Sequence, residues 1–343
     1  MQPVPAAEAW NLPVIHTTVE LAAWLDLAPN QLAWFADLQG LCLKAPQPLR
    51  HYRYRVLQKD SASIRLIEAP KPRLKEIQRR ILTGILDHIP LHDAVHGFRK
   101  GRSIQTFCVP HVGQQTVLKM DLQDFFPSIS GVRIQSLFRT IGYPETVADL
   151  LGALCTIAAP QEILHPLPRA TQELYGRPHL PQGAPTSPSL ANLCAYHVDC
   201  RLRGLADSVG ASYTRYADDL AISGNSDFSR CANRLMLRAA AIVSEEGFAV
   251  HHRKTRIMHQ SVRQQLAGLV VNERINLRRN DYDELKALLT NCVKLGPASQ
   301  NRDSHPQFRQ HLEGRVAFVA AINPGRAKKL ATLLHQIKWE TEQ

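Results

Sequence analysis

Residues 212–223 read SYTRYADDLAIS. Two short strand-like runs, Ser212–Arg215 and Leu220–Ser223, flank Tyr216-Ala217-Asp218-Asp219, which predicts a tight β-hairpin. Two adjacent acids at a hairpin tip repel each other unless a cation neutralises them. A bare Asp-Asp pair is more often an ordinary turn, so its meaning depends on the rest of the chain.

A third acid belongs to a separate strand. Thr116–Leu122 is a short apolar run that carries Asp121 near its end. Converging carboxylates of this kind suit Mg²⁺, which prefers oxygen ligands and also binds phosphate oxygens. Two such ions can activate a 3′-hydroxyl and stabilise a leaving pyrophosphate. The three acids therefore predict a site for nucleotidyl transfer.

The composition indicates a globular protein with a polyanionic partner. The 343 residues are 44% hydrophobic and 21% charged, with a formal net charge of +11, which favours nucleic acid. The seven cysteines show no zinc-site spacing, so we expect reduced thiols and a cytoplasmic protein. The longest apolar run, Val147–Ala159, contains Asp149 and is too short to span a bilayer, so we expect no membrane partner.

Helical and extended patterns alternate without a βαβ rhythm, which predicts an α+β fold. The basic run His51–Val56 and the run Ile64–Glu68 predict a hairpin with its turn at Lys59-Asp60-Ser61. Apolar residues with helical spacing predict helices over Leu74–His88, Gly131–Ala159, Ser189–Leu205, Phe228–Glu246, Asp281–Leu295 and Ser304–Ile322.

Five ordered motifs carry a family resemblance. Tyr216–Asp219 resembles the YxDD box of reverse transcriptases, and Leu118–Ile129 and Leu180–Pro188 resemble their first and second palm motifs. His251–Thr255 resembles the motif with the lysine, and Leu266–Asn272 the primer-grip turn. The resemblance implies an RNA-directed DNA polymerase with a right-hand fold of fingers, palm with an antiparallel sheet, and helical thumb.

The resemblance also implies domain boundaries. We expect an N-terminal helical segment at 1–48, fingers at 49–115 and 130–182, a palm at 116–129 and 183–272, and a thumb at 273–343.

Site roles follow residue by residue from the same resemblance. Asp121, Asp218 and Asp219, assisted by the Leu122 carbonyl, would hold two Mg²⁺ ions, with Mn²⁺ as a substitute. Lys254 would face the triphosphate and protonate pyrophosphate. The remaining nucleotide-binding residues would be Lys71, Arg79, Asp124, Phe125, Phe126, Gln182 and Gly183.

Two of these roles have plain alternatives. Phe126 would lie under the sugar and collide with a 2′-hydroxyl, which selects dNTPs, but it could instead be a core aromatic beside Phe125. Lys254 could be a solvated surface charge. Arg73 is a third fingers cation beside Lys71 and Arg79, and the sequence does not decide which of them clamps the triphosphate.

Within the family, His96–Ile104 and the segment from His311 to Pro324 are similar to retron enzymes. This implies a structured noncoding RNA as primer and template, an RNA–DNA hybrid and dNTP substrates. It is compatible with 2′-hydroxyl priming that gives branched RNA–DNA (msDNA), with antiphage defence and with an effector protein partner. Phe107-Cys108 and Leu266-Ala267-Gly268 depart from the usual retron residues, so a related defence-associated enzyme is the close alternative.

RNA contacts should be directed mainly at phosphates, and Tyr52 and Tyr54 could stack on bases. For any single cation a solvated surface charge is the commoner reading. The expected RNA-binding residues are Arg53, Arg55, Arg99, Lys100, Arg102, His111, Arg278, Arg279 and Lys328.

Other functions stay open at this level. Template-independent polymerisation, RNA-directed RNA synthesis and a catalytically silent RNA-binding scaffold are the alternatives. The sequence does not determine the cognate RNA, the priming hydroxyl or the oligomeric state.

Overall fold

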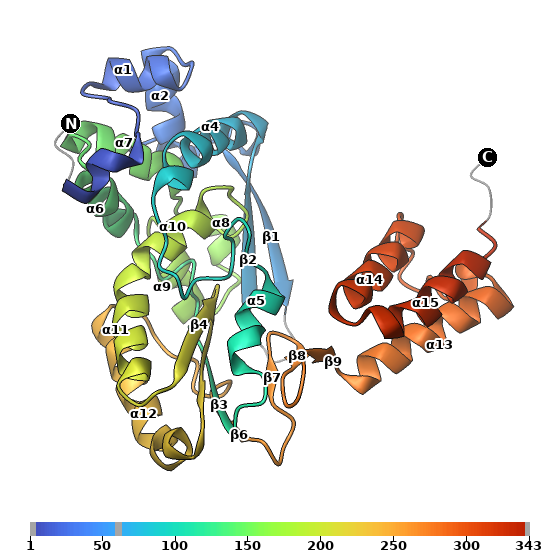
Figure 1. Ribbon diagram of the computed structural model, residues 1–343. Helices are drawn as coiled ribbons and strands as arrows, with labels where there is room; N and C mark the ends of the chain where they lie inside the picture. The colour runs from blue at the N-terminus through green and yellow to red at the C-terminus, as the bar shows by residue number, and fades with distance from the viewer. Residues whose placement is uncertain (1–4, 59–63, 340–343) are drawn as a thin grey trace.

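The structure is a computed structural model that describes residues 5–58 and 64–339. Figure 1 shows a large body, built from the N-terminal and middle parts of the chain, and a smaller group of C-terminal helices set apart from it. Strands and helices mix as the sequence pattern predicts, and the strand pairs are antiparallel. The predicted turn Lys59–Ser61 lies outside the described residues.

A four-stranded antiparallel sheet forms the centre of the body. Its strands are β3 (Thr116–Asp121), β4 (Ser212–Tyr216), β5 (Asp219–Gly224) and β6 (Arg256–His259), in the order β4-β5-β3-β6. The three strands of this sheet that were predicted, β3, β4 and β5, are confirmed, and their bounds differ from the predicted ones by one or two residues at most. The register places Asp121 directly opposite Asp219, so the two acidic segments meet at one end of the sheet.

Three helices lie beside this sheet: α10 (Ser187–Cys194), α11 (Tyr196–Asp207) and α12 (Ser226–Glu245). The buried positions of α12 are Phe228, Ala232, Leu235, Ala239 and Val243, which recur with helical spacing as predicted. The single helix predicted for Ser189–Leu205 is instead two, because Ala195 leaves helical geometry. The carbonyl of Cys194 at this break accepts a hydrogen bond from the Arg133 guanidinium at 2.7 Å.

A long hairpin and a helical layer form the other part of the body. Strands β1 (Tyr52–Gln58) and β2 (Ile64–Pro70) pair antiparallel, and α4 (Pro72–Gly84) follows β2. The region predicted as helical, Gly131–Ala159, contains α6 (Gly131–Ile141) and α7 (Glu145–Cys155). Gly142, with φ of 112°, and Pro144 separate them, because neither continues an α-helix.

The N-terminal helices are α1 (Thr18–Trp24), α2 (Pro29–Ala36) and α3 (Leu41–Lys44), and the first two pack against α7. Shorter helices are α5 (Ile104–Cys108), α8 (Gln161–Leu164) and α9 (Arg169–Tyr175). Single 3₁₀ turns lie at Pro5–Trp10, Gln47–Leu49, Leu86–His88, Val109–His111 and Pro297–Ser299. A small antiparallel sheet joins β7 (Gln265–Leu266), β8 (Leu269–Val270) and β9 (Asn276–Leu277).

The C-terminal helices are α13 (Arg279–Leu295), α14 (Phe308–Ile322) and α15 (Pro324–Gln336). They have a hydrophobic core of their own, which includes Leu285, Leu289, Leu312, Val316 and Leu330. The last predicted helix ends at Ile322, so α15 was not predicted. This helix starts at Pro324, which is a first-turn proline. A hydrogen bond of 2.7 Å from Gln105 to the Ala321 carbonyl joins α14 to the body.

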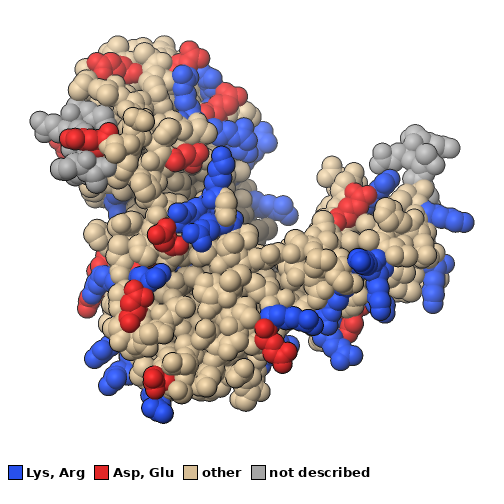
Figure 2. All heavy atoms as spheres, viewed as in Figure 1, with Lys and Arg blue, Asp and Glu red and all other residues tan. Residues whose placement is uncertain are grey.

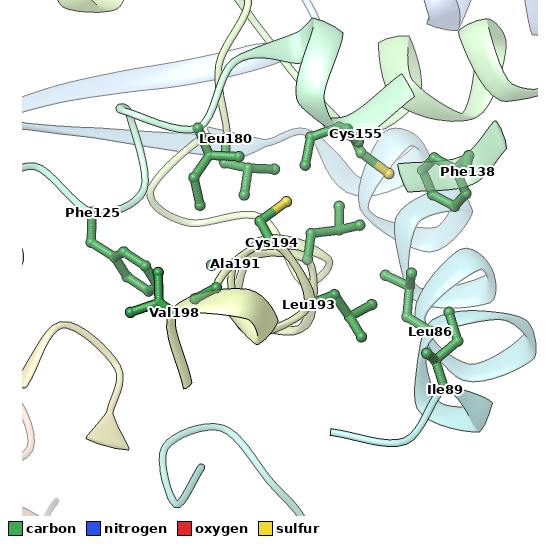
Figure 3. Packing of buried hydrophobic residues seen from close by; sticks show 14 of the residues in the cluster. Leu86, Ile89, Phe125, Phe138, Cys155, Leu180, Ala191, Leu193, Cys194 and Val198 are labelled. Atoms are coloured by element: carbon green, nitrogen blue, oxygen red, sulfur yellow. The ribbon is translucent and has the colours of Figure 1, made fainter. Parts of the chain in front are cut away.

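One continuous core ties the body together. Figure 3 shows Ala191, Leu193 and Cys194 of α10 between Phe125 and Leu180 on one side and Leu86 and Ile89 on the other. Because Phe125 belongs both to this core and to the segment after Asp121, the packing fixes where that acidic segment lies. Among the described residues, none of the helices has the length and apolar run needed to cross a bilayer.

Candidate active site

A cavity of about 700 Å³ lies where the acidic end of the central sheet faces strand β2 and helix α4. Besides β2 and α4, its wall includes the segment after β3, the loop before α10, the β4–β5 turn and the segment before β6. The predicted site residues that line it are Arg79, Asp121, Leu122, Asp124, Phe125, Phe126, Gln182, Gly183, Asp218 and Lys254.

The sheet register brings the three acids together. Asp121 and Asp219 are partners across β3 and β5, and the Leu122 amide donates to the Asp218 carbonyl at 2.8 Å. Asp121 is 5% exposed, whereas Asp219 lies outside the described lining of the cavity. Burial, followed by the nearby charges of Asp121 and Asp219, raises the pKa of the Asp218 carboxyl. This end of the sheet therefore holds excess negative charge.

Two lysines partly neutralise that charge. The Lys254 ammonium donates to both oxygens of Asp121, at 2.8 and 3.0 Å. Lys119 lies 2.9 Å from the buried Oδ1 of Asp219 in an ion pair, although this oxygen accepts no hydrogen bond of good geometry. As the side chains stand, no three His, Cys, Asp or Glu within residues 5–58 and 64–339 are grouped to hold a metal ion. The carboxylate oxygens of the three acids are suitable ligands for a hard cation. In this structure, however, lysine ammonium groups form ion pairs with two of these acids, Asp121 and Asp219.

Aromatic rings line the cavity beside the acids. Phe126 is half-buried, and its ring centroid lies 5.6 Å from that of Phe125 and 6.1 Å from that of Phe98. Phe125 is 3% exposed and packs on Phe248, so it is mainly a core residue. Phe98, which was not among the predicted site residues, also lines the cavity; it is 51% exposed and has a φ of 56°. The sequence signal that could have identified Phe98 is an aromatic residue between a glycine and an arginine, in Gly97-Phe98-Arg99.

Backbone contacts hold the loop of Gln182 and Gly183 against strand β2. The Glu68 amide donates to the Gln182 carbonyl at 2.9 Å. Gly183 has a φ of 137°, and a Cβ there would lie 2.9 Å from the Glu68 carbonyl oxygen, so the close approach requires glycine. The Gln182 side-chain oxygen is buried without a hydrogen-bond partner in the described structure. It is therefore a buried acceptor without a partner in a residue that lines the cavity.

Of the predicted fingers cations, only Arg79 lines the cavity. The Lys71 ammonium donates to the carbonyls of Gln47 and Pro48, and Arg73 bonds to Glu76 and to the Asp26 carbonyl. The nucleotide-binding role of Lys71 stays a prediction. In this structure two backbone carbonyls hold its ammonium outside the lining of the cavity.

Two cations that the sequence analysis missed, Lys75 and Arg65, do line the cavity. Lys75 precedes Arg79 by four residues, so both lie on the same face of α4. That spacing was the signal that could have found Lys75.

The predicted RNA-binding residues divide by burial. Arg53, Arg55, Lys100, Arg102 and Lys328 are exposed, and Arg278 and Arg279 are exposed but ion-paired to Asp281 and Asp283. Arg99 is half-buried and bonds to the His92 carbonyl. Figure 2 shows Lys and Arg on the C-terminal helices and on the flank of the body across a hollow from them.

Two side chains with rings that were expected to contact RNA are buried in the structure. His111 is 0% exposed, with its ring nitrogens against Ser223 and Thr214, so the prediction that it contacts RNA is wrong. Tyr52 is 3% exposed and its hydroxyl accepts from Gln78 at 2.8 Å, so it offers no face for base stacking. Tyr54 is half-buried.

Comparisons with known proteins identify the family of this chain. The family model "Reverse transcriptase (RNA-dependent DNA polymerase)" matches residues 57–306. Retron Mx65 reverse transcriptase of Myxococcus xanthus is 38% identical over 330 residues, which are 94% of this chain and 72% of that protein. Retron Mx162 reverse transcriptase of the same organism is 34% identical over 346 residues, 97% and 69% of the two chains.

Among solved structures, the foamy viral protease-reverse transcriptase in complex with RNA/DNA hybrid aligns with a TM-score of 0.43 and 15% identity. The alignment covers 85% of this chain and 32% of the viral chain, so the present chain spans about a third of that polypeptide.

Proposed function

Because the chain belongs to the retron-type reverse transcriptases, and is therefore an RNA-directed DNA polymerase, we propose that its polymerase site is the cavity lined by Asp121 and Asp218. One observation carries this proposal: the register of β3 and β5 pairs Asp121 with Asp219, which brings Asp121 and Asp218 together at the wall of a cavity large enough for a nucleotide. Convergent carboxylates in a concave, partly apolar site are the usual mark of a catalytic centre.

We propose divalent metal ions, Mg²⁺ with Mn²⁺ as a substitute, as the cofactor, held by Asp121, Asp218 and Asp219 with help from the Leu122 carbonyl. Two such ions, when bound, would supply Lewis-acid activation of the attacking hydroxyl and stabilise pyrophosphate. The excess negative charge around Asp218 supports this assignment, since a cation would relieve it. Lys254 and Lys119 would then be displaced from the carboxylates that they neutralise here.

The other cavity residues have roles in binding the nucleotide. Arg79, with Lys75 and Arg65, would bind the triphosphate, and Lys254 would hand a proton to pyrophosphate. Gln182 offers an unpaired acceptor, and Gly183 lets the backbone approach closely. Phe126 would lie under the sugar and reject a 2′-hydroxyl. Asp124 and Phe125 complete the wall.

We assign the fingers to 49–115 and 130–182, the palm to 116–129 and 183–272, and the thumb to 273–343, with 1–48 as an N-terminal helical segment. The separate hydrophobic core of the C-terminal helices supports the thumb boundary. The hollow in Figure 2, with cations on both of its sides, supports a path for an RNA–DNA hybrid.

Beyond polymerisation, we propose that the template is a structured noncoding RNA and that synthesis starts from a 2′-hydroxyl, giving a branched RNA–DNA product. We further propose a role in antiphage defence with an effector protein. Similarity to the two Myxococcus retron enzymes supports these assignments at the level of family.

The test is primer extension on an annealed RNA template with Mg²⁺ and dNTPs. We expect templated extension by the wild type and none by Asp218→Asn, which keeps the side-chain volume but removes the charge. Asp227→Asn is the matched control, because this exposed acid lies on α12 outside the cavity lining. Persistent synthesis by Asp218→Asn would refute the site. Product that ignores the template would favour template-independent polymerisation, and no product with any template would favour an RNA-binding scaffold.

A further inference from the structure

The turn that carries Asp218 has a strained backbone. Ala217, the residue just before it, has a φ of 56°, in the left-handed region. A residue with a Cβ holds this conformation only when its surroundings impose it, and such strain gathers at functional sites. The contacts around Ala217 therefore indicate what holds the turn in place.

Arg215 holds the carbonyl side of this turn. Its side chain is 0% exposed, and Nη1 donates to the Ala217 carbonyl at 3.1 Å. The Arg215 backbone is also anchored, because its amide donates to the Ala94 carbonyl at 2.7 Å and its carbonyl accepts from the His96 amide at 2.8 Å. A rigid guanidinium thus spans from the edge of β4 to the catalytic turn.

Asp199 on α11 fixes the plane of that guanidinium. Arg215 Nε and Nη2 donate to the two Asp199 oxygens at 2.8 and 2.6 Å, and both side chains are fully buried. The Tyr213 hydroxyl donates to Asp199 Oδ1 at 2.8 Å. A bidentate pair leaves a guanidinium little rotational freedom. The remaining Nη1 group is therefore directed at its two other acceptors.

Asn192 on α10 links the carbonyl side of the turn to its amide side. The Asn192 carbonyl oxygen accepts from Arg215 Nη1 at 2.9 Å, and its amide donates to the Gly97 carbonyl at 3.0 Å. A Cβ on Gly97 would lie 2.5 Å from the Ala217 backbone nitrogen, so the 94–97 segment lies directly against the turn. Arg215 and Gly97 together confine Ala217.

We propose that Arg215, clamped by Asp199 and Asn192, is a positioning residue for polymerisation that holds the Tyr216–Asp219 turn and so places the Asp218 carboxylate. Arg215 is outside the described lining of the cavity, so it acts through the turn. A buried ion pair adds little net stability over apolar side chains of the same volume. The consequence of the Arg215–Asp199 pair is that it fixes the direction of the guanidinium. The inference rests on the proposed role of Asp218.

The test compares two ways of loosening the turn. Arg215→Lys keeps a positive charge beside Asp199 but cannot bond both carboxylate oxygens and still reach the Ala217 carbonyl. Gly97→Ala leaves the ion pair intact and displaces the turn from its amide side. We expect each variant to lose about 100-fold in kcat, the order that a 1 Å misplacement causes. The KM for dNTP should stay within about twofold of wild type, because the cations proposed to bind the triphosphate, Arg65, Lys75 and Arg79, lie on other elements.

Tyr213→Phe is the matched control for stability. It removes a bond to the same Asp199 carboxylate without touching the turn, so it should lower Tm while kcat stays at the wild-type value. All variants are assayed well below their Tm, and Asp218→Asn gives the inactive reference. If Arg215→Lys does not fold, Gly97→Ala alone decides.

Folded variants with wild-type kcat, beside an inactive Asp218→Asn, would overturn the positioning role and leave the proposed site standing. An active Asp218→Asn would instead overturn the proposed site, and the positioning role with it.

Discussion

The Lys254 ammonium bridges both carboxylate oxygens of Asp121, at 2.8 and 3.0 Å. The Asp121 side chain is 7% exposed and that of Lys254 is 46% exposed, so the lysine can leave without unburying its partner. The same two oxygens are proposed as metal ligands. An ammonium and a divalent cation would therefore compete for them.

The first prediction concerns that competition. Lys254→Met should tighten Mn²⁺ binding in the absence of substrate by about fivefold, equivalent to about 1 kcal/mol for one partly exposed ion pair. It should also lower kcat, because the proposed proton donor is lost. Calorimetric titration of the free protein with Mn²⁺ measures the affinity. Lys100→Met, at an exposed position outside the cavity lining, should leave the affinity unchanged. Equal affinities in all three proteins would contradict the competition.

The second prediction concerns the sugar. Phe126→Ala should raise the use of NTPs relative to dNTPs by about 10- to 100-fold in kcat/KM, because the ring no longer blocks the 2′-hydroxyl. Single-nucleotide incorporation with each substrate measures the ratio. Phe126→Tyr keeps the bulk and should keep the discrimination. An unchanged ratio in Phe126→Ala would mean that this ring only packs against Phe98 and Phe125.

The third prediction concerns a buried pair beside the nucleotide loop. Glu68 Oε2 lies 2.8 Å from His179 Nε2, both side chains are at most 1% exposed, and His179 Nδ1 faces the Arg177 carbonyl. Both ring nitrogens therefore face acceptors. Burial raises the pKa of the Glu68 carboxyl, and the His179 contact opposes this effect.

His179→Ala should cost about 3–5 kcal/mol by leaving a buried acid alone, and Glu68→Ala about 1–3 kcal/mol by leaving an unpaired N–H. Glu68→Gln should cost least, because its amide oxygen still accepts from the ring. Urea unfolding measures the order. A Glu68→Gln variant as unstable as His179→Ala would show that the charge itself is required.

The fourth prediction is a pH dependence from His111. Burial, followed by the smaller effect of the nearby His96, lowers the pKa of this imidazole to about 3. Thr214 donates its proton to the Phe107 carbonyl, so it accepts from His111 Nε2, and Nδ1 accepts from Ser223. A neutral ring satisfies both contacts. Its folded pKa lies below the unfolded value of about 6.5, so stability is present above pH 6.5 and is lost as the pH falls.

Because His111 is protonated in the unfolded chain but not in the folded one, it alone should reduce the free energy of unfolding by about 1.4 kcal/mol per pH unit below pH 6.5. His111→Gln should remove that part of the slope, measured by urea unfolding between pH 7 and the acid limit of folding. If His111→Gln keeps the full wild-type slope, the acid sensitivity arises elsewhere.

Local sequence determined the elements and the chemistry. Period-two and helical patterns identified the strands beside Asp121 and Asp218 and the amphipathic helix after Ser226, because backbone geometry sets these periods within a few residues. The order of short motifs identified the family, which the comparisons confirm. The break at Ala195 was missed, since a helix pattern can continue across a residue that leaves the helix.

Tertiary structure alone decided which distant residues meet. Asp121 faces Asp219 through strand register, and Arg215 finds Asp199 and Asn192 through the packing of α10 and α11 on the sheet. His111 was predicted to bind RNA, yet it is buried because Ser223 and Thr214 satisfy its ring. Lys71 was predicted to bind the nucleotide, yet two backbone carbonyls hold its ammonium outside the cavity lining. A polar side chain is placed by the partners that folding offers, and those partners lie far away in the sequence.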